Sequence, residues 1–366
     1  MNKKITVISG DGIGPEIMNE AIKVLDCIQE KFNHKFDYDY KLAGGIAIDE
    51  CGECLPQDTI DSCLSTDSTL LGAVGGYKWD NLEGHLRPEK ALLGIRKLMK
   101  LYSNIRPCVL YNSLKDCSPL KENILEKGID FLIVRELTGG IYFGEHSTEC
   151  LGDKKVAKDI MMYNTEEIER ITKVAINLAK ARKSKITVVD KANVLDTSRL
   201  WREVTQSVLK SHSDIEYEYM YVDNCAMQLI KEPSRFDVIL TENMFGDILS
   251  DEASMLTGTI GNIGSFSVGY GDRGMYEPIH GSAPDIAGKG IANPIGMISS
   301  ASMMLRYSFG MEEEANLIDR AISSFYNCGY RTKDLIINND EKYFTTKEVG
   351  EYIINYILKY KKDIDL

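Results

Sequence analysis

Residues 3–32 decide the fold. They read KKITVISGDGIGPEIMNEAIKVLDCIQEKF, which is a short β-branched run, a glycine-rich turn and a long segment with helical periodicity. Similar short apolar runs recur in FLIVREL (131–137), KITVVD (185–190) and FDVILT (236–241), and an amphipathic segment lies between the first two, at 165–182. Strand-like runs that alternate with helical segments predict an α/β fold.

The turn at 10–16, GDGIGPE, follows a strand and opens a helix, as a dinucleotide-binding fingerprint does. The G-x-G-x-x-G spacing is nevertheless absent, because the third glycine comes one residue early and Pro15 takes its place. We therefore exclude a standard Rossmann pyrophosphate site. The loop at 280–294, HGSAPDIAGKGIANP, is the better cofactor candidate, since it combines close-approach glycines with Asp285, a possible acceptor for ribose hydroxyls.

The composition limits the class of protein. With 366 residues the chain has the length of two domains, and 43 Lys and Arg against 55 Asp and Glu give a net charge of −12. That charge argues against binding to duplex nucleic acid, although a few local arginines can still attract an anionic small molecule. The sequence shows neither a signal segment nor an apolar run long enough to span a membrane, so we expect a cytoplasmic protein without a membrane partner.

The nine cysteines are an odd number scattered through the chain, which suits a reducing compartment. Only Cys51 and Cys54 have a redox or zinc spacing, and no second pair of zinc ligands is evident. We favour two small apolar side chains in a loop at these positions over a functional pair.

Three further segments carry structural predictions. The segment 164–182 predicts an amphipathic helix with Thr165 as its N-cap. Alternating residues and a Gly-Asp turn signal at 141–164 predict an extended hairpin, which could serve as a dimer-forming arm. Regular periodicity disappears in the glycine-dense stretch 258–296, which is typical of binding loops.

Two aspartates form the sharpest local feature. In FGDILSDE (245–252), Asp247 and Asp251 are four residues apart and share one face of the predicted helix. Like charges at this spacing repel each other, and a hard divalent cation between them would relieve the repulsion. A solvated helix face is the alternative, and this pair alone does not decide between the two; nearby Glu242 and Glu252 favour the metal somewhat.

Cationic and proton-transfer candidates complete the set. Arg96, Arg106 and Arg135 each stand outside charged runs, and guanidinium groups bind carboxylates bidentately, so together they suggest a di- or tricarboxylate ligand. Taken singly, each is better explained as a surface or ion-pair residue. Lys191 directly follows a strand-like run and could act as a base, with Tyr142 as the complementary acid. A solvated lysine and a structural tyrosine are the alternatives.

Eight motifs in order resemble the isocitrate/isopropylmalate dehydrogenase family, and the resemblance runs from the N-terminus to about Phe309. They are GDGIGPE, LRPEKALLGIRK, NIRP, RELTGGIYFG, DKANVLDTSRLWREV, DNCAMQL, TENMFGDILSDEASMLTG and YEPIHGSAPDIAGKGIANP. The resemblance implies the family's two-domain α/β fold, which is not a standard Rossmann fold. It places a discontinuous first, cofactor-side domain at 1–101 and 258–366 and a second domain at 102–257.

The resemblance also implies an activity. We expect NAD-dependent oxidative decarboxylation of (2R,3S)-3-isopropylmalate to 4-methyl-2-oxopentanoate, a step of leucine biosynthesis, assisted by Mg²⁺ or Mn²⁺ in a homodimer with shared active sites. Within the same fold, a D-malate, homoisocitrate or other alkylmalate dehydrogenase is the alternative. From a different class, the chain could be a non-catalytic ligand-binding relative, against which the intact Lys191, Tyr142 and three aspartates count.

Site residues are implied by matching motif positions. Arg96, Arg106 and Arg135 would bind the malate carboxylates; Asp247, Asp251 and Asp223 would hold the metal, Asp223 also facing the substrate. Lys191 would take part in deprotonating the C2 hydroxyl, and Tyr142 would protonate the product enol; the family places Lys191 and Asp223 across the dimer interface.

Leu92 and Leu93 would form an apolar wall for an isopropyl group, completed by Val194 from the other subunit. The implied cofactor-binding residues are Ile13, Glu89, Asn193, His280, Gly281, Ser282, Ala283, Asp285, Ile286 and Asn293. Asp285-Ile286 favours NAD, because relatives that use NADP carry Lys-Tyr there.

Overall fold

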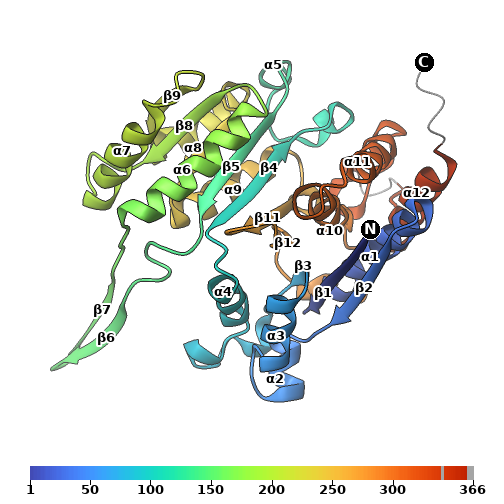
Figure 1. Cartoon of the computed structure of the whole chain (residues 1–366), viewed down its shortest axis with the longest axis horizontal. Helices are drawn as coiled ribbons and strands as arrows, with labels where there is room; N and C mark the ends of the chain where they lie inside the picture. Colours follow the sequence, from blue (N-terminus) through green and yellow to red (C-terminus); the bar gives the residue numbers. More distant parts are fainter. Residues whose placement is uncertain (339–341, 361–366) are drawn as a thin grey trace. The chain divides into compact units, whose positions relative to one another are not determined.

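The computed structural model describes residues 1–338 and 342–360 (Figure 1). The chain divides into two compact units. The first contains Met1–Leu101, Tyr111–Ser118 and the chain from Gly258 on, and the second contains Tyr102–Leu110 and Pro119–Thr257. Strands and helices alternate in both, which confirms the α/β prediction. The domain boundaries expected from the sequence stay a prediction, and the compact units differ from them at 111–118.

The first unit is built on five strands in the order β2-β1-β3-β12-β11. Their bounds are β1 Asn2–Gly10, β2 Lys35–Tyr40, β3 Ser68–Ala73, β11 Gly264–Val268 and β12 Gly274–Pro278. The pairs are parallel except β11 with β12, which is antiparallel. The glycine-dense stretch therefore contains two buried strands as well as loops, because neighbouring strands supply hydrogen bonds that local periodicity does not reveal.

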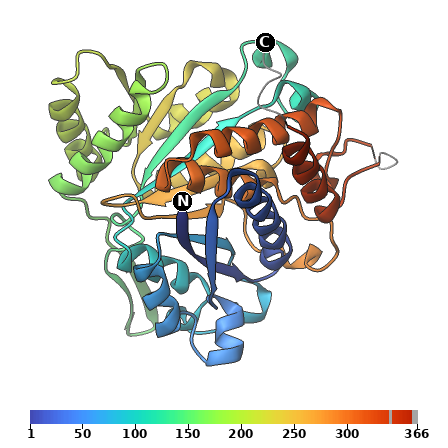
Figure 2. The ribbon, with the colours of Figure 1, turned by 45° about the vertical axis from the view of Figure 1, so that its right-hand side comes forward.

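Seven α-helices surround these strands in the described part of the first unit. They are α1 Gly14–Phe32, α2 Gly45–Cys51, α3 Gln57–Ser65, α4 Glu89–Leu98, α10 Ile295–Met303, α11 Glu312–Asn327 and α12 Thr346–Lys359. Helix α1 packs against α10 and α12, so that both ends of the chain share one core (Figure 2). A short π-helical turn, Met304–Ser308, follows α10.

Asp11 lies at the end of β1 and is buried. Its carboxylate accepts hydrogen bonds from the backbone N–H groups of Gly45, Ile46 and Gly75, each at 2.8 Å. It thereby caps α2, whose own N-cap residue Gly44 offers no side chain, and holds the loop that follows β3. The aspartate of the GDGIGPE turn is therefore a structural anchor at the carboxyl ends of the strands.

The second unit has its own five strands, in the order β4-β5-β10-β8-β9. Their bounds are β4 Ser103–Val109, β5 Asp130–Glu136, β8 Lys185–Asp190, β9 Glu216–Tyr221 and β10 Val238–Thr241. The first pair is antiparallel and the others are parallel. Helices α6 Thr165–Lys180 and α7 Asp196–Leu209 cover one face, and α8 Val222–Lys231 and α9 Asn243–Leu256 the other (Figure 1); α5 is the short Glu122–Leu125.

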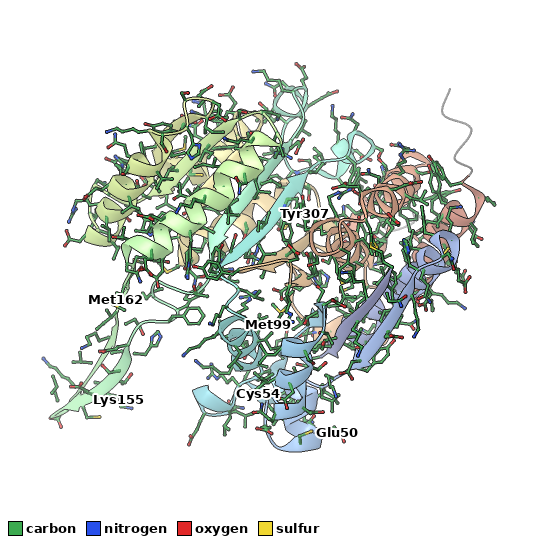
Figure 3. All side chains as sticks on the ribbon, in the orientation of Figure 1. Glu50, Cys54, Met99, Lys155, Met162 and Tyr307 are labelled. Carbon is green, nitrogen blue, oxygen red and sulfur yellow. The ribbon has the colours of Figure 1, made fainter. Side chains whose placement is uncertain are left out.

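A two-stranded hairpin extends from the second unit (Figure 1). It consists of β6 His146–Leu151 and β7 Lys154–Asp159 in antiparallel register, and most of its side chains are exposed, including Lys155 (Figure 3). The predicted hairpin is confirmed, and its role as a dimer arm stays a prediction. The helix after it begins as expected, but its N-cap is Asn164 rather than Thr165, because the extended Asn164 exchanges hydrogen bonds with Glu167 in a capping box.

No helix within 1–338 and 342–360 combines the length and the apolar character needed to cross a membrane.

We predict that Asp11→Asn lowers the melting temperature of the protein. The amide would turn an N–H group toward backbone N–H donors, and a buried mismatch of this kind costs about 1–3 kcal/mol. Differential scanning calorimetry measures the shift, and Asp37→Asn on the exposed edge of β2 is the matched control, for which we expect almost no change. Equal melting temperatures for Asp11→Asn and the native protein would refute the anchoring role.

Candidate functional site

Arg135 occupies the carboxyl end of β5 and is only 3% exposed. Its Nε and Nη2 donate to Asn243 Oδ1 at 3.0 and 2.7 Å, and its Nη1 donates to Asp247 Oδ1 at 2.5 Å. A buried guanidinium is costly unless its N–H groups are paired, and α9 supplies these partners. These hydrogen bonds fix the position of the helix relative to β5.

Helix α9 begins where Glu242 accepts a hydrogen bond from Phe245 N at 3.0 Å and so caps its first turn. Asp247 and Asp251 lie on this helix, four residues apart, as the sequence predicted. Asp247 Oδ2 accepts from the Tyr142 hydroxyl at 3.0 Å. The side chain of Asp251 is 61% exposed and its carboxylate is therefore accessible from solvent.

Arg106 comes from β4, the antiparallel neighbour of β5, and is also buried. Its Nη1 donates to Ser250 Oγ at 2.6 Å and to Asp251 Oδ1 at 3.4 Å, while its Nη2 lies 3.6 Å from Asp247 Oδ1. The structure thus brings together two of the three predicted arginines and both helical aspartates. Repulsion between the aspartates is offset by guanidinium groups, so this face is a mixed-charge cluster rather than a simple solvated surface.

Tyr142 follows the Gly139–Gly140 turn and faces the same cluster. Burial, together with the negative charge of Asp247, raises the pKa of its hydroxyl to about 12. The phenol therefore keeps its proton at neutral pH, which is the state a proton donor needs.

Lys191 directly follows β8, as expected, and its Nζ lies 2.5 Å from Asp223 Oδ1 in the first turn of α8. The hydrogen bond from Lys191 lowers the pKa of the Asp223 carboxyl. Asp223 is 60% exposed at its side chain, and Asn193 and Val194, in the turn after Lys191, are exposed as well. Lys191, Asp223 and Val194 thus bring a cation, a carboxylate and an apolar side chain to a solvent-accessible part of the second unit.

The donor chemistry at Asp247 and Asp251 fits a hard divalent cation, because both residues offer carboxylate oxygens from one helix face. Within the described residues, no three His, Cys, Asp or Glu side chains are grouped closely enough to hold a metal ion. Asp223 therefore does not complete a three-carboxylate set inside one chain. Cys51 and Cys54 are free thiols, and Cys54 packs against the apolar core beside α4 (Figure 3), which fits the predicted apolar role. That prediction is wrong for Cys51, which is exposed and ends α2 rather than lying in a loop.

The first unit contains a pocket of about 470 Å³. Six of the predicted cofactor residues line it: Ile13, His280, Gly281, Ala283, Ile286 and Asn293. The sequence did not single out Thr259, Ile260, Ile291, Ala292, Lys333 or Asp334, which line it too. The two isoleucines and Ala292 lie in glycine-rich stretches that could have suggested them, whereas Lys333 and Asp334 come from a distant segment that only the fold brings here.

His280 gives this pocket a defined polarity. Its Nδ1 lies 2.9 Å from the carbonyl oxygen of Gly281 and must donate to it, which leaves Nε2 as an acceptor. Among the described residues, the buried Nε2 has no hydrogen-bond partner, and burial lowers the pKa of the imidazole, which keeps it neutral. Apolar walls and an unpaired acceptor fit an adenine ring with its exocyclic amine.

Of the remaining predicted cofactor residues, Ser282 and Asp285 lie in this loop and Glu89 lies on α4, whereas Asn193 lies in the second unit, in the turn after Lys191. Ser282 is buried, and its carbonyl accepts from Ile13 N at 2.8 Å, so the GDGIGPE turn forms a wall of the cofactor loop. Asp285 is exposed, and its Oδ2 accepts from Tyr77 at 3.4 Å. Glu89 is the exposed first residue of α4.

Arg96, Leu92 and Leu93 lie on α4. Arg96 is buried and its Nη2 lies 2.8 Å from Glu277 Oε1, while its buried Nε has no partner among the described residues. Leu92 packs partly against the core, and Leu93 is half-buried. Arg96 is therefore already neutralised by an acid within the first unit, unlike an arginine reserved only for a ligand.

Comparisons with known proteins identify relatives of this chain. The family model described as isocitrate/isopropylmalate dehydrogenase matches residues 4–353. The 3-isopropylmalate dehydrogenase of Helicobacter hepaticus is 55% identical over 98% of this chain and 100% of its own length. The enzyme of the same name from Clostridium pasteurianum is 53% identical over 96% of this chain and 98% of its own. Among solved structures, the isocitrate dehydrogenase of Methylococcus capsulatus aligns with a TM-score of 0.84 at 34% identity, covering 97% of this chain and 99% of that one.

We predict that Asp251→Asn weakens Mn²⁺ binding by roughly 10–100-fold, because it removes the exposed carboxylate from the helix face. Titration followed by electron paramagnetic resonance of free Mn²⁺ measures the affinity without requiring turnover. Glu252→Gln is the control, since it makes the same acid-to-amide change one residue further along α9 and should leave binding intact. Unchanged affinity in Asp251→Asn would remove this residue from the metal site.

Proposed function

Because the chain belongs to the isocitrate/isopropylmalate dehydrogenase family, we propose that it catalyses the NAD-dependent oxidative decarboxylation of (2R,3S)-3-isopropylmalate. The observation that carries this proposal is the cluster of Arg106, Arg135, Tyr142, Asp247 and Asp251 in the second unit. It combines carboxylate-binding cations, metal-binding oxygens and a protonated phenol. Relatives named 3-isopropylmalate dehydrogenase, above 50% identity over nearly their full length, favour this substrate.

The chain's own residues have distinct tasks in this reaction. Arg106 and Arg135 orient a malate carboxylate through their guanidinium groups. Lys191, beside Asp223, takes part in removing the proton of the C2 hydroxyl, and Tyr142 returns a proton to the enol that follows loss of CO₂. When bound, NAD supplies the hydride acceptor and Mg²⁺ or Mn²⁺ supplies the Lewis acid that polarises the C2 oxygen.

An apolar surface near Glu89 supports an alkyl-substituted malate. Leu92 and Leu93 lie one helical turn beyond Glu89 on α4, and Val194 in the second unit is 62% exposed. An exposed valine beside a catalytic lysine suits contact with a substrate alkyl group held by another subunit. Such apolar contacts discriminate between substrates by only about 1–3 kcal/mol, so weak activity on other alkylmalates is expected.

The cofactor loop supports NAD over NADP. The exposed Asp285 carboxylate can accept from ribose hydroxyls and would repel a 2′-phosphate. Lys289 is exposed in the same loop, but it follows Gly288 in the shared glycine-rich segment and does not distinguish the two cofactors.

A homodimer with shared sites is also part of the proposal. Since Asp223 is not grouped with Asp247 and Asp251 within the described chain, a second copy is the natural source of the third carboxylate. Four large apolar side chains support an interface on α8 and α9, because each is more than half exposed: Met227, Ile230, Ile248 and Met255. The sequence pointed to the hairpin arm and, through the resemblance, to Lys191, Val194 and Asp223, but it did not single out these four side chains.

The compartment we propose is the cytoplasm. All nine cysteines are free thiols, and several are buried, which suits a reducing environment. The net charge of −12 fits a protein whose partners are a small anionic substrate and a second copy rather than nucleic acid.

We predict that purified protein with Mg²⁺ and NAD forms NADH with a higher kcat/KM for 3-isopropylmalate than for D-malate or homoisocitrate. The reason is the apolar side chain pair on α4, which gains contact with an isopropyl group and none with a further carboxylate. Absorbance at the NADH band measures the rates. Equal or better kcat/KM for either competitor would overturn the substrate assignment, and absence of turnover with every acid would favour a binding protein.

A separate prediction tests whether each active site is built from residues of two chains. Lys191→Ala and Tyr142→Phe should each be nearly inactive alone, whereas dissociating and reassembling an equal mixture should restore about a quarter of the native activity. In a mixed dimer, one site receives both intact residues and the other receives neither. Reassembly that leaves activity at the level of the single variants would argue against sites built from two chains.

A further inference from the structure

Resting on the proposed function, we propose that Asn243 is a positioning residue that orients Arg135 for the substrate carboxylate without adding a second negative charge to that of Asp247. Asn243 is the first residue of α9 and is 1% exposed. It stands four residues before Asp247 on the same helix, so both side chains reach the guanidinium of Arg135 from one face.

The orientation of the Asn243 amide is fixed by its neighbours. Oδ1 accepts from both Nε and Nη2 of Arg135, and Nδ2 donates to the carbonyl oxygen of Gly139 at 3.0 Å. A guanidinium can only donate and a carbonyl can only accept, so the flipped amide would lose all three hydrogen bonds. Asn243 therefore accepts two hydrogen bonds from one edge of the Arg135 guanidinium and also donates one to the turn that leads to Tyr142.

The choice of an amide has an electrostatic consequence. A carboxylate at this position would stand beside that of Asp247 and further reduce the positive charge that attracts an anionic substrate. The neutral amide satisfies Nε and Nη2 without adding a second negative charge. Asp247 holds the remaining edge through Nη1, and its other oxygen accepts from Tyr142.

Gly246 contributes independently to the same placement. A Cβ built on Gly246 would lie 2.6 Å from Cγ of Arg135, which is closer than such atoms approach each other. The aliphatic part of the Arg135 side chain therefore packs against α9 at Gly246, where no side chain fills the space. Asn243, Gly246 and Asp247 together form the groove and the two polar contacts that fix the arginine.

A buried hydrogen-bond network supports the start of α9. The Tyr163 hydroxyl accepts from Asn243 N at 2.9 Å and donates to Glu242 Oε2 at 2.9 Å. Tyr163 in turn packs edge-on against Trp201, with ring centroids 5.5 Å apart. Because Asn243 is held through its backbone as well as its side chain, its amide is a rigid support for Arg135 rather than an adaptable contact.

The test compares steady-state constants of Asn243→Ala, Asn243→Asp and Gly246→Ala with those of the native dimer. Asn243→Ala removes the support, and Gly246→Ala displaces the arginine stem while keeping the amide. Each should raise KM for isopropylmalate roughly tenfold or more, since a hydrogen bond to a charged group is lost or misplaced. KM for NAD should stay within about twofold, and kcat should change less than KM, as expected when ground-state binding is weakened.

Asn243→Asp keeps an acceptor for Arg135 and adds a negative charge beside it, and it also loses the hydrogen bond from Nδ2 to the carbonyl oxygen of Gly139. The proposal predicts that KM for isopropylmalate rises as in Asn243→Ala. Asn164→Ala, which removes the cap of α6 in the same unit, is the control for a general loss of stability and should leave both KM values unchanged.

Unchanged KM for isopropylmalate in both Asn243→Ala and Gly246→Ala would overturn the inference, as would an equal rise of KM for NAD. Native protein that shows no turnover would instead contradict the proposed function. In that event, crystal structures of Asn243→Ala and Gly246→Ala decide: a guanidinium of Arg135 that has not moved in either refutes the positioning role, and a displaced one supports it.

Discussion

The burial of Arg135 is the constraint on which the second unit depends. A guanidinium out of water is costly unless its N–H groups are paired. Helix α9 provides Asn243 and Asp247, four residues apart on one face, as hydrogen-bond partners. The position of the helix, of the Tyr142 turn and of the exposed Asp251 carboxylate follows from satisfying this one charge.

Features encoded by local spacing could be predicted from the sequence. The i to i+4 interval of Asp247 and Asp251 requires only a helix to place them on one face, and β8 requires only its apolar run to deliver Lys191 at its end. The loop at 280–294 likewise carried its own glycine signal, and it lines the cofactor pocket. Family motifs added the roles, which no spacing could have supplied.

Features that depend on distant partners could not be predicted. Asp334 reaches the cofactor pocket from about forty residues beyond the glycine loop, and Asn243 matters because of Arg135, far earlier in the chain. The N-cap error at Thr165 has a different cause: two neighbouring residues can both cap, and only the backbone conformation of Asn164 decides between them. Buried polar networks are specified by three-dimensional geometry, which single-sequence patterns do not contain.

We propose that α9 and Arg135 form one half of a site that a second chain completes. A crystal structure of the dimer with Mn²⁺ and isopropylmalate tests it most directly through the anomalous signal of the metal. We expect a peak at coordination distance from Asp251 and from Asp223 of the second chain, with a substrate carboxylate on Arg135. A metal bound by residues of one chain alone, or a substrate without contact to Arg135, would contradict the account.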